Sequence, residues 1–236
     1  MKNLYKQKKT KEFIDYIESW LDELPDVKLH EIVSDPKKSA LISVDMINGF
    51  CKSGALASPR VAAIIDPVTN LMQAAWDIGI RHIILSEDAH PPDAVEFVAF
   101  PPHAIQGTEE AETVDAIKRL PFFDRIKIIN KNSISSSANT SLGIWVENHK
   151  DVKTFFVVGD CTDLCTYQIA MYLKTESNAR QLNNRVIVAA DTVETYHRSV
   201  ETAQLEGGLP HDGDLMHIIF LYHLALNGIE VVKTIR

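Results

Sequence analysis

Residues 152–175, VKTFFVVGDCTDLCTYQIAMYLKT, contain the pattern that decides the fold. The apolar run that opens this stretch predicts a buried strand over 152–160, and the spacing after Cys165 predicts a helix over 165–180. A strand that passes through a short turn directly into a helix is typical of a βαβ unit, and such units build parallel sheets.

The same alternation of apolar runs and helical spacing continues on both sides of this stretch. Further strands are predicted over 39–46, 81–88, 124–131, 185–191 and 229–235. Helices are predicted over 67–80, 113–120, 141–150 and 214–228. Together these elements predict an α/β fold with an open, mostly parallel six-stranded sheet and helices on both faces.

An N-terminal helix stands outside this alternation. The apolar positions between 10 and 24 fall on one helical stripe, with Thr10 as the predicted N-cap and Pro25 as the predicted stop. We interpret residues 1–37 as a helical extension packed on a main domain formed by residues 38–236. The basic stretch 2–11 is interpreted as the solvated start of this helix.

The composition excludes several classes of function. The formal net charge of −8 leaves no basic surplus to neutralise phosphates, which argues against nucleic-acid binding. No apolar run approaches the roughly 20 residues that cross a bilayer, and the N-terminal region carries charges throughout, unlike a signal peptide. Three cysteines are too few for a disulfide framework, so we expect a protein of the reducing cytoplasm.

Polar side chains follow five of the predicted strands, at or just past the point where each strand ends. They are Asp45, Asp88, Lys131, Asp160 and Asp191. Because ligands of open α/β sheets bind at the carboxyl ends of the strands, we expect the functional site at this edge.

Cys165 is the candidate nucleophile because it begins a predicted helix. The positive end of the helix dipole favours a thiolate, and backbone N–H groups of the preceding loop can form an oxyanion hole. Asp45 can relay protons, and the ammonium of Lys131 lowers the thiol pKa. Asp163 is predicted to cap the helix. The alternative is a cysteine that serves only as a small buried apolar residue.

A second cluster lies in residues 86–108. Asp88 and His90 are two apart in an extended segment, and Glu96 and His103 can return to the same point through a proline-rich loop. Two histidines and two carboxylates suit Zn²⁺, Mn²⁺ or Fe²⁺. The alternative is a polar surface loop without a metal.

Several motifs resemble those of the isochorismatase-like cysteine hydrolases, and they occur in the same order. They are DMINGF (45–50), DAH (88–90), FPPHAIQGTEEAE (100–112), KNS (131–133) and GDCTDLC (159–165). The resemblance covers roughly residues 38–236, and within the superfamily it is greatest to plant-type nicotinamidases. It therefore implies the fold of that superfamily and an amidohydrolase activity.

The resemblance also implies roles for individual residues. Cys165 would be the nucleophile, Asp45 the proton relay and Lys131 the group that stabilises the thiolate. A non-proline cis bond between Asp160 and Cys161 would aim the amides of Cys161 and Cys165 into an oxyanion hole.

The remaining implied roles concern the substrate ring and a divalent metal, expected to be zinc. Phe50 and Phe100 would sandwich a pyridine ring, and the wall of the pocket near Ala138 would be open. The implied metal ligands are Asp88, His90, Glu96 and His103.

The expected reaction is hydrolysis of nicotinamide to nicotinate and ammonia through a cysteine thioester. Three alternatives stay open: an amidohydrolase of the same superfamily acting on a ureido or aromatic amide, a catalytically silent ligand-binding member, and a metal-centred hydrolase with an incidental cysteine. We expect a small-molecule amide as the substrate, a homo-oligomer, and no nucleic-acid or membrane partner.

Overall fold

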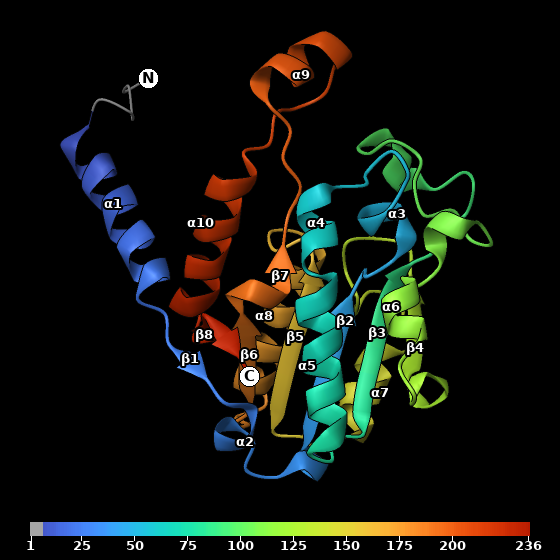
Figure 1. The fold of residues 1–236 in the computed structure, drawn as a ribbon, viewed down its shortest axis with the longest axis vertical. Helices are drawn as coiled ribbons and strands as arrows, with labels where there is room; N and C mark the ends of the chain where they lie inside the picture. The colour runs from blue at the N-terminus through green and yellow to red at the C-terminus, as the bar shows by residue number, and fades with distance from the viewer. Residues whose placement is uncertain (1–6) are drawn as a thin grey trace.

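A parallel sheet forms the centre of the protein in the computed structural model, which describes residues 7–236 (Figure 1). Its continuous row has the order β4-β3-β2-β5-β6-β8, and every pairing in it is parallel. The strands of this row are β2 (Ser39–Val44), β3 (His82–Asp88), β4 (Lys127–Lys131), β5 (Thr154–Asp160), β6 (Arg185–Ala189) and β8 (Glu230–Val232). The predicted α/β class and the mostly parallel sheet are confirmed.

The structure differs from the predicted six strands in two places. A two-residue strand, β7 (Val193–Glu194), pairs with the end of β5 and makes the sheet seven-stranded. The predicted last strand, 229–235, is split into β8 and β9 (Thr234–Ile235), and β9 pairs with β1 (Asp26–Val27) in a separate small sheet. Periodicity predicts neither change, because pairings this short leave too few residues to form a pattern.

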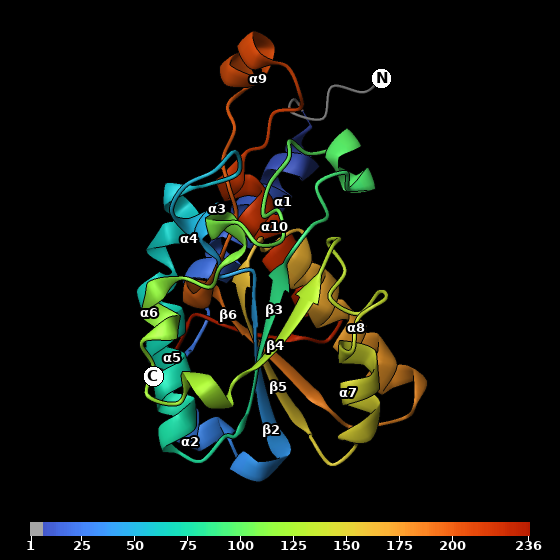
Figure 2. The same ribbon diagram turned by 90° about the vertical axis from the view of Figure 1, so that its right-hand side faces the viewer.

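Helices cover both faces of the sheet (Figure 2). One face carries α2 (Leu29–Ile32), α4 (Pro59–Ala63), α5 (Ile65–Asp77) and α6 (Asp115–Lys118), and the other carries α7 (Leu142–Asn148), α8 (Cys165–Ala179) and α10 (Gly213–Leu226). Side chains of β5 alternate between two apolar layers, with Phe156 in the first and Phe155 in the second. A strand buried on both faces is apolar at nearly every position, which explains the continuous run in the sequence.

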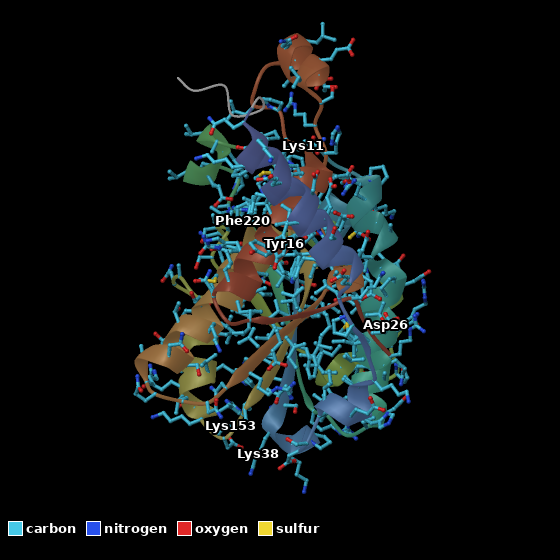
Figure 3. The ribbon with its side chains drawn as sticks, turned by 90° about the vertical axis from the view of Figure 1, so that its left-hand side faces the viewer. Lys11, Tyr16, Asp26, Lys38, Lys153 and Phe220 are labelled. Carbon is cyan, nitrogen blue, oxygen red and sulfur yellow. The ribbon has the colours of Figure 1, made fainter. Side chains whose placement is uncertain are left out.

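The N-terminal helix α1 (Lys8–Asp22) lies along α10 on the outside of the molecule (Figure 3). The rings of Phe13, Tyr16 and Trp20 all meet Tyr222 of α10 edge to face. The predicted N-cap, Thr10, is wrong: the N-cap is Gln7, three residues earlier, and its side chain does not cap the helix. The first part of the basic stretch 2–11 lies outside the described residues.

Two further segments reach the edge of the sheet where the strands end. The helix α3 (Asn48–Cys51) follows β2, and a protruding arm that carries α9 (Val200–Glu206) follows β7 (Figure 1). Among the residues that the structure describes, no helix combines the length and the apolar character needed to cross a membrane.

Candidate active site

A pocket opens at the carboxyl ends of the central strands. Four of the five predicted strand-end residues are buried at this edge: Asp45, Asp88, Lys131 and Asp160. They follow or end β2, β3, β4 and β5, which are neighbours in the sheet. Parallel register therefore gathers side chains that are far apart in the sequence.

Asp191 is the exception, and its placement at the site was wrong. It is exposed, and it lies near Arg236 and Asp26 instead. The reason is the register of β6, which pairs only with the first half of β5 over Thr154–Phe156. The position beside Gly159 and Asp160 is taken by β7, so the end of β6 is turned away from the pocket.

Gly159 allows the nucleophile loop to pass close to β2. It has a φ of 106°, and a Cβ there would lie 2.0 Å from the carbonyl oxygen of Val44. Any larger residue would therefore push β5 away from β2 and from Asp45, which follows Val44.

Lys131 is the central cation of the site. Its Nζ lies 2.7 Å from Oδ2 of Asp45, 2.5 Å from Oδ1 of Asp88 and 3.5 Å from Sγ of Cys165. The other carboxylate oxygen of Asp45 accepts the backbone N–H of Asp88 at 2.8 Å. All four side chains are buried, so these contacts fix each other's positions with little competition from water.

The two carboxylates next to Lys131 differ in acidity. Burial and the neighbouring Asp88 raise the pKa of Asp45 to about 6, against the opposing effect of Lys131. Burial also disfavours ionised Asp88, but Lys131 and the two nearby histidines outweigh it and lower the pKa of Asp88. Burial lowers the pKa of Lys131, but Asp45, Cys165 and Asp88 act in the opposite direction and outweigh it. The pKa of Lys131 is therefore raised well above its usual range, and the lysine is protonated. Asp88 is therefore the permanent anion, and Asp45 can exchange a proton near neutral pH.

Cys165 begins α8 as predicted, but its thiol is not readily ionised. Burial raises the pKa of Cys165, and the lowering effect of Lys131 does not overcome it because Asp45 and Asp88 act in the opposite direction. Lys131 lowers the pKa of the thiol, as expected, but burial and the two carboxylates act against it. The thiol needs a base, and a carboxylate oxygen of Asp45 lies within 4.8 Å of its sulfur.

The loop before Cys165 has the expected non-proline cis bond between Asp160 and Cys161. Among the described residues, no protein acceptor takes the backbone N–H of Cys161 or that of Cys165. Two free amides beside a thiol are the donors that an oxyanion hole needs.

Asp163, between these two amides, does not cap α8. The residue before the helix is Leu164, and no side chain caps it. Asp163 instead accepts hydrogen bonds from Thr195 at 2.6 Å and from Nε2 of His211 at 2.7 Å. The ring of His211 stacks on Tyr196 with centroids 4.0 Å apart, and Tyr196 lines the pocket.

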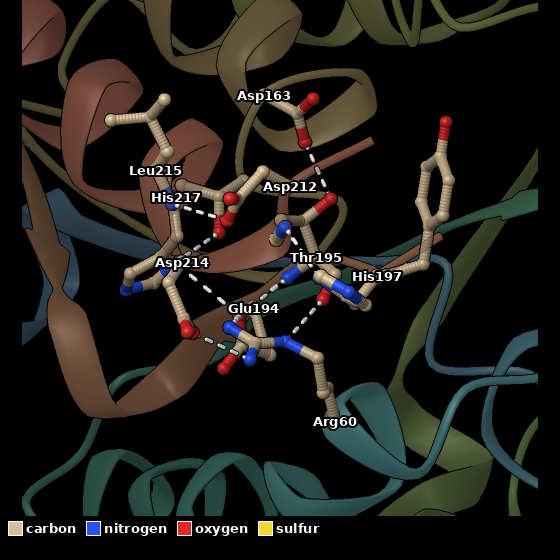
Figure 4. Close-up of polar contacts among 12 residues, drawn as sticks. Arg60, Asp163, Glu194, Thr195, His197, Asp212, Asp214, Leu215 and His217 are labelled. Atoms are coloured by element: carbon tan, nitrogen blue, oxygen red, sulfur yellow. Dashed lines mark hydrogen bonds and ion pairs between the residues drawn. The ribbon is translucent and has the colours of Figure 1, made fainter. Parts of the chain in front are cut away.

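Figure 4 shows how the segment that follows β7 is held beside the nucleophile loop. Arg60 of α4 donates to Glu194, to the carbonyl of Thr195 and to Asp214. His217 of α10 contacts the hydroxyl of Thr162 at 2.9 Å. Local sequence patterns do not reveal this network, because its members come from four separate elements.

Three of the four predicted metal ligands lie together. Ligand atoms of Asp88, His90 and His103 are all within 4.8 Å of one another, and all three residues are buried. Neither ring nitrogen of His90 has a hydrogen-bond partner among the described residues. Nδ1 of His103 donates to the carbonyl of Pro101, which leaves Nε2 facing Asp88. Each histidine therefore has a ring nitrogen free to bind a metal, next to the ionised carboxylate of Asp88. This set of groups fits a divalent metal.

Glu96 is not part of this group of three. It lies on a short 3₁₀ turn, Val95–Val98, and lines the pocket near His103. The sequence alone could not separate it from the other candidates, because its position depends on how the proline-rich loop folds back.

The pocket walls are aromatic and aliphatic. Phe50 and Phe100 both line it, with ring centroids 5.6 and 6.2 Å from that of His103. Ala138 is exposed and lies outside the lining, where Ile134 stands instead. The lining residues that the sequence did not indicate are Leu56, Val61, Ile134, Leu164 and Tyr196.

Comparison with known proteins agrees with this fold. The isochorismatase domain matches residues 39–211. The chain belongs to the isochorismatase family.

Among its relatives, Nicotinamidase 1 of Arabidopsis thaliana is 30% identical over 225 residues, which cover 86% of this chain and 89% of the relative. The fold is also that of a cysteine hydrolase from Pseudomonas syringae, with a TM-score of 0.68, 22% identity and coverage of 84% and 90% of the two chains. A pyrazinamidase of Pyrococcus horikoshii, solved in complex with zinc, has a TM-score of 0.64 and 24% identity over 83% of this chain and 99% of its own.

Proposed function

We propose that this protein is an amidase that hydrolyses nicotinamide to nicotinate and ammonia through a thioester on Cys165. The observation that carries the proposal is the contact of Lys131 with both Asp45 and Cys165, next to a pocket that is lined by Cys165 and by Asp88 and His103 of the candidate metal group. The similarity to Nicotinamidase 1 of Arabidopsis thaliana supports the choice of substrate.

The walls of the pocket suit a flat aromatic amide. Phe50 and Phe100 would hold the two faces of the ring. The carboxamide oxygen would accept hydrogen bonds from the free backbone N–H groups of Cys161 and Cys165. This places the carboxamide carbon beside the sulfur of Cys165.

In the first half of the reaction Asp45 acts as the base that the buried thiol needs. Its carboxylate takes the proton of Cys165 as the sulfur attacks the amide carbon, and Lys131 stabilises the negative charge on the sulfur. Asp45 then gives the proton to the amide nitrogen, the C–N bond breaks and ammonia leaves. The products of this half are ammonia and a thioester on Cys165.

In the second half a water molecule attacks the thioester carbon. Asp45 takes a proton from the water and returns it to the sulfur when the C–S bond breaks. The acid is released and the thiol is restored, so Asp45 carries one proton in each half of the reaction.

Asp88, His90 and His103 would hold the divalent metal, with zinc as the proposed ion because a zinc-containing relative shares the fold. When bound, the metal would supply a Lewis acid for the pyridine nitrogen and so orient the ring. Asp88 would be both a metal ligand and a partner of Lys131, because its Oδ1 contacts the Lys131 ammonium and its Oδ2 lies 3.5 Å from Nε2 of His90. The free cysteines agree with a protein of the reducing cytoplasm, where we place this activity.

The proposal is tested by ammonia release from nicotinamide, with benzamide, a ureido acid and an aliphatic amide as comparison substrates. The metal content of the same sample is measured in parallel. We expect rapid release from nicotinamide and close to one divalent ion per chain. Preference for the ureido acid would assign a different amidohydrolase activity, and binding of nicotinamide without release would indicate a silent member.

A further inference from the structure

Asp160 is a buried acid that the reaction does not use. Its side chain is 1% exposed, and it lines the pocket. Among the described residues, its Oδ2 has no hydrogen-bond partner. A carboxyl group left unpaired in a protein interior is destabilising, so its presence here points to a partner that arrives from the pocket.

Within residues 7–236, the groups around Asp160 offer its Oδ2 no hydrogen-bond partner. It ends β5 on the face that carries Phe156 and Val158, and this face meets the apolar pocket residues Phe50 and Val61. Lys131 is already shared by Asp45, Asp88 and Cys165. Arg60, on the adjacent α4, is engaged by Glu194, Asp214 and the carbonyl of Thr195.

Asp160 is held rigidly in this position. Its strand pairs with β7, where Asp160 is opposite Glu194, and Gly159 packs against Val44 on the other side. Burial and the nearby Asp45 raise the pKa of Asp160 well above its usual range, which favours its neutral form. A neutral carboxylic acid offers one O–H donor and one carbonyl acceptor.

Resting on the function proposed above, we infer that Asp160 is a specificity-determining residue that selects aromatic amides whose ring carries an additional amino, hydroxyl or oxo group. Such a group can donate to the carbonyl oxygen of Asp160 or accept its O–H. The unsubstituted ring of nicotinamide remains a substrate, but it presents only C–H at this point and leaves the acid unpaired, so a nicotinamide with a suitable substituent should have the higher kcat/KM. Sites built around a buried polar group discriminate strongly against analogues that lack its partner.

The test uses matched pairs of substituted nicotinamides. At each free ring carbon, an amino compound is compared with its methyl counterpart, which has a similar size but cannot form hydrogen bonds. We expect one ring position at which kcat/KM for the amino compound exceeds that for the methyl compound by about tenfold or more. In Asp160→Leu this ratio falls close to one, while in Asp160→Asn, which keeps a donor and an acceptor, most of the preference remains.

Several outcomes would overturn the inference. One is that, in the unmodified protein, kcat/KM for the amino and methyl compounds agrees within about twofold at every ring position. This measurement needs no variant, so it tests the inference even if Asp160→Leu fails to fold. A preference that survives in Asp160→Leu would place the selecting group elsewhere. An equal loss of activity on all amides in Asp160→Asn, with the ratios unchanged, would assign Asp160 to proton transfer.

The same pairs can be measured as ligands of Cys165→Ala by calorimetry, which separates this inference from the proposed function. Suppose that the unmodified protein hydrolyses no amide, but Cys165→Ala binds the amino compound more tightly than the methyl compound. The proposed reaction then fails and the role of Asp160 stands. If nicotinamide is hydrolysed and no pair differs, the reaction stands and the role of Asp160 fails.

Discussion

The ammonium of Lys131 lies 2.7 Å from the carboxylate of Asp45, and neither group is reached by solvent. This pair joins the carboxyl ends of β4 and β2, which are separated in the sheet by β3. It brings a permanent cation to the sulfur of Cys165 and a proton acceptor to the same place. The following predictions depend on this arrangement.

The nucleophile is tested by two cysteine variants that are matched in burial. Cys165→Ala should lower kcat by about a thousandfold or more, because no thioester can form. Cys161→Ala should keep most of the activity, since the reaction uses only its backbone amide. Both variants should melt within about 2–4 °C of the unmodified protein, measured by calorimetry. The opposite pattern of activities would make Cys161 the nucleophile.

Removal of the central cation should destabilise the fold. Lys131→Met leaves Asp45 and Asp88 buried without their counter-charge, so the free energy of unfolding in urea should fall by about 3–5 kcal/mol. Lys52→Met is the matched control, because Lys52 forms an exposed 2.7 Å ion pair with Glu109. The control should change stability by less than about 1 kcal/mol. Similar losses in both variants would contradict a special role for the buried pair.

The pH dependence of the reaction should report the carboxyl group of Asp45. Its raised pKa of about 6 means that the base is protonated, and so inactive, below that pH. Measured kcat/KM should therefore fall by about tenfold per pH unit below pH 6 and level off above it.

Glu87 is the control for this assignment, because burial raises its pKa to about 7 and it also lies near Asp45. In Glu87→Gln, the fall of kcat/KM below about pH 6 should remain. Loss of this pH dependence in the Glu87 variant would show that Glu87, and not Asp45, controls the rate.

The metal group is tested by comparing His90 with Glu96. His90→Ala and His103→Ala should each lose most of the bound metal, because each removes one of three clustered ligands. Glu96→Ala should keep it, since Glu96 lies outside that cluster. Metal content is measured by mass spectrometry on dialysed samples. Alkylation of Cys165 should persist in all three variants, and loss of metal from Glu96→Ala alone would restore Glu96 as a ligand.

Substrate selectivity tests the proposed contact with the ring nitrogen. Nicotinamide and benzamide have nearly the same shape, and Phe50 and Phe100 would hold both rings equally well. A site that binds the ring nitrogen should nevertheless favour nicotinamide by about a hundredfold or more in kcat/KM. The ratio should shrink in His103→Ala. Comparable hydrolysis of the two amides would remove nicotinamide as the specific substrate.

The sequence by itself determined the alternation of strands and helices and the position of Cys165 at the start of a helix. It also identified Asp45, Asp88 and Lys131 as residues that could meet. These features follow from short-range periodicity and from one general property of parallel sheets, that the carboxyl ends of their strands share an edge. The motifs added the family, which the comparison confirms.

Only the tertiary structure decided which strand ends share the pocket and how its groups are charged. Asp191 is turned away because β7 replaces β6 beside the end of β5, and Asp163 binds His211 instead of capping α8. Burial raises the pKa of the Cys165 thiol, and Oδ2 of Asp160 has no hydrogen-bond partner among the described residues. Strand register and desolvation depend on every element that packs around a residue, whereas a sequence pattern reports only on its neighbours along the chain.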